Sequence, residues 1–177
     1  MSVTEIATLR LVPPHTWSSP ATRSFFAAAA SQQAARSGCP LHYFQDTADA
    51  AIVYILTGWE SVAAHEAWIA SEANQKLLER GTGLIEVVGL QHARFAVELE
   101  GIDVVILERW EESGGGVEQE RGAIVDVSGV VEEAPGHCYR LRGFAETQER
   151  GGEAGKLGEG TTFLRRMSVH DDDGVAA

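Results

Sequence analysis

The sequence predicts an α+β fold, in which a β-α-β-β-α-β unit over residues 4–99 is followed by a β-rich extension over residues 100–168. This prediction rests mainly on a change in the spacing of apolar residues, from a strand-like run to helical spacing. Residues 51–56 form an unbroken apolar run rich in Ile, Val and Tyr, which is typical of a strand covered on both faces. Apolar residues then recur at helical spacing between positions 62 and 77. Beyond residue 99 no window is long and periodic enough for a helix.

The first predicted strand covers residues 5–12, where Ala7, Leu9 and Leu11 alternate with more polar neighbours until two prolines end it. A helix over residues 19–36 follows. Ser19 is expected to cap its free amides, and proline is favoured at the first helical position because it has no amide to leave unpaired. Gly38 is expected to end this helix.

A strand over residues 40–45 precedes a turn at residues 46–49, so it should pair with the apolar strand as a hairpin. The second helix is predicted over residues 59–80, and a last strand-like segment over residues 84–99. This order is the ferredoxin-like unit, an antiparallel sheet with both helices on one face.

The extension carries four strand-like segments separated by glycine-rich, charged connectors. They cover residues 102–110, 123–131, 137–146 and 161–167, and the tail over residues 169–177 is expected to be disordered.

A faint internal echo links residues 55–61 to residues 106–112. Glycines at positions 114–116 fall where the matching helix would begin, so a second copy would have lost its helices.

Composition excludes several classes of function. With 26 acidic and 14 basic residues, the formal net charge of -12 repels nucleic acids and anionic lipid surfaces. No apolar run approaches the roughly 20 residues of a membrane span, and prolines 13 and 14 interrupt any signal-like core, so a cytoplasmic location is expected. Cys39 and Cys138 stand alone, which favours two reduced thiols over a disulfide or a zinc site.

The junction over residues 56–71, with Trp59, His65 and Trp68, resembles the antibiotic-biosynthesis-monooxygenase-like dimeric α/β barrels. The resemblance covers residues 4–99. It implies a homodimer whose two sheets form a barrel, with a pocket between the sheet and the helices of each subunit. It also implies an oxidoreductase or related enzyme of secondary metabolism, because members include cofactor-free monooxygenases, haem-degrading enzymes, lactone isomerases and polyketide cyclases.

Elementary packing agrees with a homodimer. A four-stranded sheet with helices on one face leaves its other face apolar and uncovered, and a second copy of the chain would cover it. The alternative is that the β-rich extension folds over the same face and leaves a monomer.

The haem-degrading members of this superfamily use an asparagine on the first strand and a histidine near the end of the second helix. Residues 5–12 contain no asparagine and residues 74–78 contain no histidine, so the haem ligand is missing. No zinc, phosphate-loop or serine-hydrolase motif is present either. We therefore expect neither a metal nor a cofactor.

Three histidines lie on neighbouring predicted elements that can surround one cavity. Imidazole is the natural general base near pH 7, although a histidine beside a buried helical stripe is often simply packed and hydrogen-bonded. Large aromatics at helix-sheet contacts are usually core residues, yet they can also wall a flat substrate. The candidate catalytic residues are His65, His92 and His42, and the candidate substrate-binding residues are Trp59, Trp68, Tyr54 and Phe25.

Two hypotheses about function follow. The first is a cofactor-independent monooxygenase, isomerase or cyclase that acts on an aromatic or polyketide-like small molecule in an apolar pocket between sheet and helices. The alternative is a non-catalytic barrel that binds a small ligand or only dimerises. An open cavity lined by one of the candidate histidines would favour the first, and a collapsed core the second.

Overall fold

The computed structural model describes residues 2–111, 122–145 and 160–169. Apart from residue 169, the predicted tail lies outside them. The first half contains β1 (Val3–Leu11), α1 (Pro20–Ser37), β2 (Leu41–Asp46), β3 (Ile52–Trp59), α2 (Val62–Ile69), α3 (Glu72–Gly81) and β4 (Ile85–Ala93). The second half contains β5 (Val104–Glu111), β6 (Val125–Val130), β7 (His137–Phe144) and β8 (Thr161–Met167).

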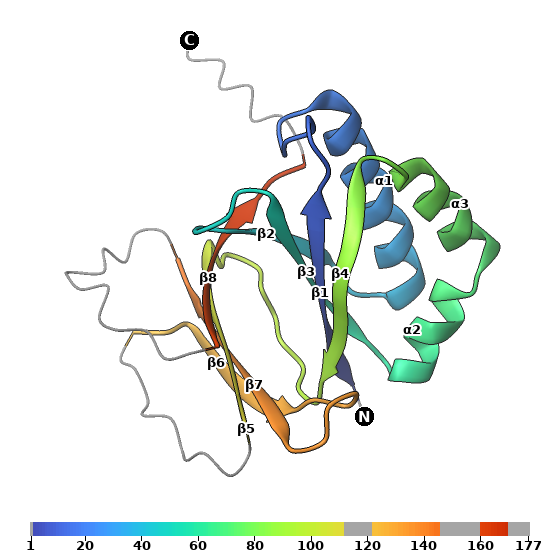
Figure 1. Cartoon of the computed structure of the whole chain (residues 1–177). Helices are drawn as coiled ribbons and strands as arrows, with labels where there is room; N and C mark the ends of the chain where they lie inside the picture. The colour runs from blue at the N-terminus through green and yellow to red at the C-terminus, as the bar shows by residue number, and fades with distance from the viewer. Residues whose placement is uncertain (1, 112–121, 146–159, 170–177) are drawn as a thin grey trace.

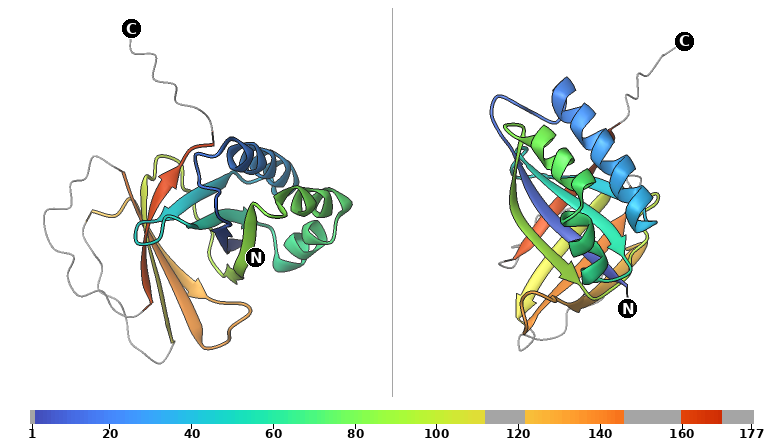
Figure 2. Two further views of the ribbon diagram at one scale, coloured as in Figure 1. Left: turned by 45° about the horizontal axis from the view of Figure 1, so that its top comes forward. Right: turned by 90° about the vertical axis from the view of Figure 1, so that its right-hand side faces the viewer.

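The first half is the predicted ferredoxin-like unit. Its strands are antiparallel in the order β4-β1-β3-β2, and β2 and β3 form the expected hairpin. All three helices lie together on one side of the sheet (Figure 1), and Figure 2 shows the same layer from two further directions. Phe26 of α1, Trp68 of α2 and Leu77 of α3 pack with Val53 and other sheet residues in one buried cluster. The predicted fold class is confirmed.

Two details of the helices differ from the predictions. The single helix predicted over residues 59–80 is wrong, because α2 ends at Ile69 and α3 begins after an extended Ser71. The Ser71 hydroxyl accepts from the Asn74 amide and donates to the Trp68 carbonyl, which caps both helices at the break. Ser19 precedes α1, but its side chain accepts from Thr16 instead of the first helical turn.

The second half repeats the strand order of the first. Its described strands continue the sheet in the order β8-β5-β7-β6, which is β4-β1-β3-β2 with each number raised by four. The echo between residues 55–61 and 106–112 does not mark this repeat, because it compares β3 with β5, whereas the topological equivalent of β3 is β7. Among the described residues the second half carries no helix.

The eight described strands curl until the two ends of the sheet meet. β2 pairs with β8 in the middle of the order, and Ala93, at the end of β4, bridges Val131, just after β6. The Arg94 amide donates to the Val130 carbonyl at 2.9 Å across this seam. A side chain at Gly129 would place its Cβ 2.5 Å from the Arg94 carbonyl oxygen, so glycine permits the close approach.

The inside of this barrel is mostly apolar and is built from both halves. Ile6, Phe44 and Leu56 supply the face of the first sheet that lacks helices, and residues of the second half cover it. The prediction that a second copy covers this face is therefore wrong, and the alternative in which the extension folds over it is the one observed. The covering side chains include Ile102, Val105, Leu107, Leu141 and Leu164.

We expect the protein to be a monomer in solution, because the face that would drive dimerisation is already covered within one chain. Light scattering coupled to size exclusion should report a mass near 19.0 kDa. A stable species of twice that mass would contradict this prediction and would require a different interface.

No helix within the described ranges is both long and apolar enough to cross a membrane.

Candidate functional site

A cavity of about 180 Å³ lies between the helices and the outer face of β1, β3 and β4. Its walls are mostly apolar, and its polar groups are the side chains of Glu5, Gln33, His65 and Asn74. The lining also contains Leu78 and Val87, whose exposed fractions are 38% and 57%, so the cavity opens between α3 and β4.

Glu5 is the buried carboxyl group of this cavity, with an exposed fraction of 3%. Residues 3, 5, 7, 9 and 11 of β1 alternate toward the helices, so Glu5 shares that face with Ala7 and Leu9. Its Oε2 atom accepts from Gln33 Nε2 at 2.6 Å and from the Trp59 indole at 2.7 Å. Burial raises the pKa of Glu5 to about 7, although these two hydrogen bonds act in the opposite direction.

His65 lies beside Glu5, on α2. The Ser61 side chain caps α2 by accepting from the Ala64 amide, and the His65 ring stacks on Trp59 with 4.5 Å between ring centroids. His65 Nε2 is 3.4 Å from Glu5 Oε2. Burial, and then the charge of a protonated His92, lower the pKa of His65 to about 4. Its imidazole is therefore neutral at pH 7.

His92 continues the chain of contacts on the other side of His65. On β4 it is the cross-strand partner of Glu5, so the two side chains emerge from adjacent strands on the same face of the sheet. His92 Nε2 lies 2.7 Å from His65 Nδ1. His92 Nδ1 contacts a carboxylate oxygen of Glu133, and the His92 amide donates to the other oxygen at 2.8 Å.

Glu133 belongs to the second half of the chain, in the connection between β6 and β7. The closing seam brings it to the first half, since the adjacent Glu132 amide donates to the His92 carbonyl at 2.9 Å. Partial burial raises the pKa of Glu133, but the hydrogen bonds from the His92 ring and backbone outweigh it, so the pKa lies below its ordinary value. Glu133 is therefore ionised at pH 7, and its side chain is 38% exposed.

These four groups form a series of contacts in the order Glu5, His65, His92 and Glu133, which leads from the cavity to the surface and is hydrogen-bonded from His65 to Glu133. Such a series can accept, hold and pass on protons. It does not resemble a metal site, because the histidine nitrogens face one another. Within the part of the chain that the structure describes, no three His, Cys, Asp or Glu side chains are grouped to hold a metal ion.

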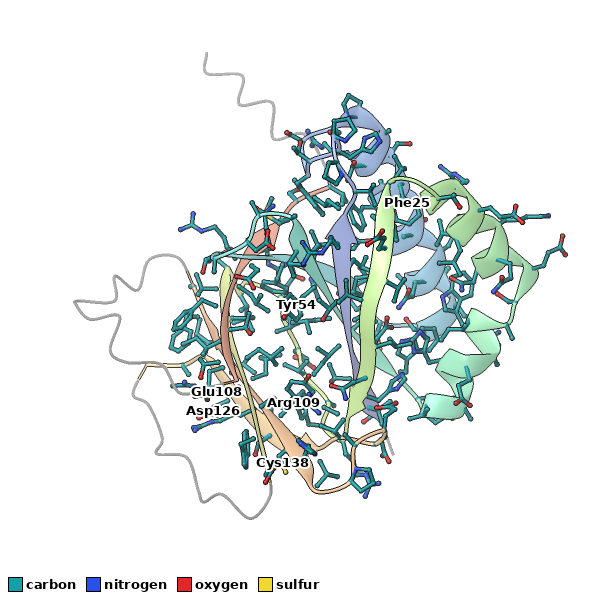
Figure 3. The ribbon with its side chains drawn as sticks, viewed as in Figure 1. Phe25, Tyr54, Glu108, Arg109, Asp126 and Cys138 are labelled. Atoms are coloured by element: carbon teal, nitrogen blue, oxygen red, sulfur yellow. The ribbon has the colours of Figure 1, made fainter. Side chains whose placement is uncertain are left out.

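The structure separates the four candidate aromatic residues. Trp68 and Phe25 line the cavity, whereas Trp59 lies behind it and orients Glu5 and His65. Tyr54 packs against the barrel interior, on the opposite face of β3, because neighbouring residues of a strand alternate between faces. Figure 3 shows Phe25 on the helix side of the sheet and Tyr54 on the other side. The prediction that Tyr54 borders the same pocket is therefore wrong.

His42 is also absent from this site. It pairs with Leu56 across the sheet and shares its face, away from the cavity. Arg166 Nη1 lies 3.0 Å from His42 Nδ1, and burial followed by the arginine charge lowers the pKa of His42 to about 4. His42 lines a separate cavity of about 700 Å³, next to residues 96–100.

Sequence reasoning missed Glu5, Gln33 and Glu133. One signal for Glu5 was available, because a carboxylate in the inward phase of an otherwise apolar strand is costly to bury without a role. Gln33, a polar residue on the buried face of α1, gave a weaker signal of the same kind. Nothing near Glu133 in the sequence indicates its contact with a residue 41 positions away.

No protein-family profile matches this chain, and no curated protein matches it. Solved structures do match. A proposed monooxygenase of Fusobacterium nucleatum is 8% identical with a TM-score of 0.65, over 94% of this chain and 93% of that one. A proposed chlorite dismutase is 8% identical with a TM-score of 0.58, over 95% of this chain and 95% of that one. A proposed monooxygenase of Lactobacillus acidophilus is 14% identical with a TM-score of 0.51, over 81% of this chain and 77% of that one.

The chain has the fold of the antibiotic-biosynthesis-monooxygenase-like α/β barrels. The likeness extends over nearly the whole chain in two of these structures, so the second half belongs to the shared fold. The sequence indicated this resemblance over residues 4–99, and the structural likeness extends it to the second half. At these identities the likeness concerns the fold and leaves the chemistry to the residues of the site.

Proposed function

We propose that this protein is an enzyme that removes a proton from an apolar small molecule bound between the helices and the sheet, with Glu5 and His65 acting together as the general base. One observation carries the proposal: a buried carboxyl with a pKa of about 7 lies 3.4 Å from a neutral imidazole, and both line an apolar cavity. A catalytic base is most effective when its pKa lies near the working pH.

The roles of the two residues follow from their surroundings. Because burial raises the pKa of Glu5 to about 7, its ionised form is accessible near pH 7 and can take a proton from a phenol or an activated C–H group. The neutral His65 ring is close enough to receive that proton and to pass it toward His92. Gln33 and Trp59 hold the Glu5 carboxyl in place by donating to the same oxygen.

The size of the cavity narrows the substrate class. A cavity of roughly 150 Å³ with apolar walls is known to hold benzene, so about 180 Å³ accommodates a single substituted ring. A polyketide with several fused rings would have to extend through the opening beside Leu78 and Val87. We therefore propose one-ring phenols, quinols and enolisable ketones as substrates.

Two outcomes are open to the carbanion or phenolate once it has formed. It can regain a proton at another atom, which is an isomerisation or the start of a cyclisation. It can instead react with dioxygen, in which case an activated CH₂ group and O₂ give a carbonyl group and water. The structural neighbours proposed as monooxygenases favour the second outcome, and it needs no bound cofactor beyond O₂ itself.

Haem chemistry, which the name of one neighbour suggests, does not fit these residues. Among the described residues, His65 is the only histidine that lines the cavity, and its Nδ1 atom is hydrogen-bonded to His92 while its Nε2 atom faces Glu5. Neither nitrogen can reach an iron atom without breaking a contact of the buried series. A cavity sized for one ring is also too small for a porphyrin.

The proposal is tested by a screen of one-ring quinols, phenols and 1,3-diketones for oxygen uptake and for exchange of substrate hydrogen with deuterated water. No cofactor is added. We expect a substrate that wild type converts, that the His65→Ala and Glu5→Gln variants convert much more slowly, and that His42→Ala converts normally because His42 lies on the other face of the sheet. Binding without uptake or exchange would overturn the proposal in favour of a non-catalytic ligand-binding barrel.

A further inference from the structure

We propose that Glu133, contributed by the second half of the chain, sets the tautomers of His92 and His65 and so leaves the Nε2 lone pair of His65 facing Glu5. The tautomer assignment stands on the contacts and applies to the neutral rings that dominate near pH 8. Only its consequence for turnover rests on the proposed function, in which Glu5 and His65 form the base.

The assignment begins at Glu133, where both carboxylate oxygens are in use. One accepts from the His92 backbone amide at 2.8 Å, and the other contacts His92 Nδ1. An ionised carboxylate can only accept hydrogen bonds. His92 Nδ1 must therefore carry a hydrogen.

The remaining protons follow from the fact that a neutral imidazole has one N–H group. With its hydrogen on Nδ1, His92 offers a lone pair at Nε2, which lies 2.7 Å from His65 Nδ1. His65 must then donate from Nδ1. Its Nε2 atom is left with a lone pair, 3.4 Å from Glu5 Oε2. A lone pair at this position can accept a proton from Glu5, and it disfavours the ionised carboxylate.

Glu133 reaches this position only because the barrel closes. The bridge between Ala93 and Val131 and the hydrogen bond from the Glu132 amide to the His92 carbonyl hold the β6–β7 connection against the end of β4. The second half of the chain therefore completes a site whose other members all lie in the first half.

The variant Glu133→Gln should reverse both tautomers. A glutamine has one accepting oxygen and one donating amide group, whereas the backbone N–H of His92 can only donate. That N–H takes the oxygen, so the amide group faces His92 Nδ1 and forces its hydrogen onto Nε2. His92 then donates to His65 Nδ1, and His65 carries its hydrogen on Nε2, where the N–H group faces Glu5 and lowers the pKa of Glu5.

The experiment is ¹⁵N NMR of the histidine ring nitrogens near pH 8, where neutral rings dominate. In wild type we expect His65 and His92 to be protonated at Nδ1, and in Glu133→Gln both at Nε2. The matched control is Glu132→Gln, which removes the same charge one residue away, because Glu132 pairs with Arg94 at 2.8 Å and makes no hydrogen bond to the His92 ring. The control should keep the wild-type tautomers.

Several results would overturn the inference. The wild-type spectrum alone does so if His65 carries its hydrogen on Nε2, and this test does not depend on the folding of any variant. Unchanged rings in a folded Glu133→Gln variant would also do so. Reversal in the Glu132→Gln control would show that loss of charge, and not the contact with His92, controls the tautomer.

Turnover separates this inference from the proposed function. If both tautomers reverse and turnover falls by about 10² or more, the tautomer assignment and the proposed function are both supported. If both rings reverse and turnover is unchanged, the tautomer assignment stands and the Glu5–His65 base is wrong. If the rings do not reverse, the role of Glu133 is wrong whatever happens to turnover.

Discussion

Replacing His65 with alanine should lower turnover of the substrate found by the screen by about 10² to 10⁴, because a positioned proton-transfer group typically contributes that much. The variant also removes the ring that stacks on Trp59 and leaves His92 Nε2 without its partner. A loss of stability of about 1 to 3 kcal/mol should therefore accompany the loss of activity.

Melting temperature and turnover should be measured on the same sample, so that loss of fold is not mistaken for loss of chemistry. The variant His65→Gln keeps a donor toward His92 but has no basic nitrogen, so it should recover stability without recovering turnover. Full activity in the His65→Ala variant would remove His65 from the chemistry and leave Glu5 as the sole base.

Glu5 should make the wild-type protein less stable at alkaline pH. Its pKa is about 7 in the folded state and near 4.5 when exposed, so folding favours the protonated carboxyl. This contribution is complete below about pH 4.5 and is lost as pH rises through 7. With about 1.4 kcal/mol for each pKa unit, the loss is on the order of 3 kcal/mol. The variant Glu5→Gln, which stays neutral, should not show it.

Urea unfolding of both proteins at several pH values between about 5 and 9 would measure the difference. His65 contributes in the opposite sense, because its folded pKa of about 4 lies below 6.5 and its contribution is lost as pH falls. Both proteins share the His65 contribution, so subtracting the free energy of unfolding of Glu5→Gln from that of wild type at each pH removes it. Glu60→Gln, at an exposed site, is the control. Parallel pH profiles for wild type and Glu5→Gln would contradict the raised pKa of Glu5.

Local patterns in the sequence were sufficient for most elements of the fold. The apolar run at residues 51–56 lies within β3, and Gly38 ends α1 in a left-handed conformation with φ of 75°. The strand β8 occupies the predicted residues 161–167. These features depend on neighbouring residues only, so periodicity and turn chemistry reveal them.

Errors arose where two local signals competed or where the face of a strand mattered. Ser71 is compatible with a helix interior, but its side chain caps α3 and breaks the predicted helix. His42 and Tyr54 lie on strands beside the site, yet both are on the face of the sheet that lines the barrel interior. A shift of one residue along a strand reverses the face, so strand assignment without register could not place them.

The amino-acid sequence by itself determined the ferredoxin-like order of the first half, the β-rich character of the second, and the presence of His65 and Trp68 on the helix that covers the sheet. Only the tertiary structure decided that the second half closes the barrel, and that Glu5 and Glu133 stand at the two ends of one histidine pair. The physical reason is the range of the interactions. Helix caps and hydrophobic periods act over a few residues, whereas the contact between His92 and Glu133 spans 41 positions and exists only after the two ends of the sheet have met.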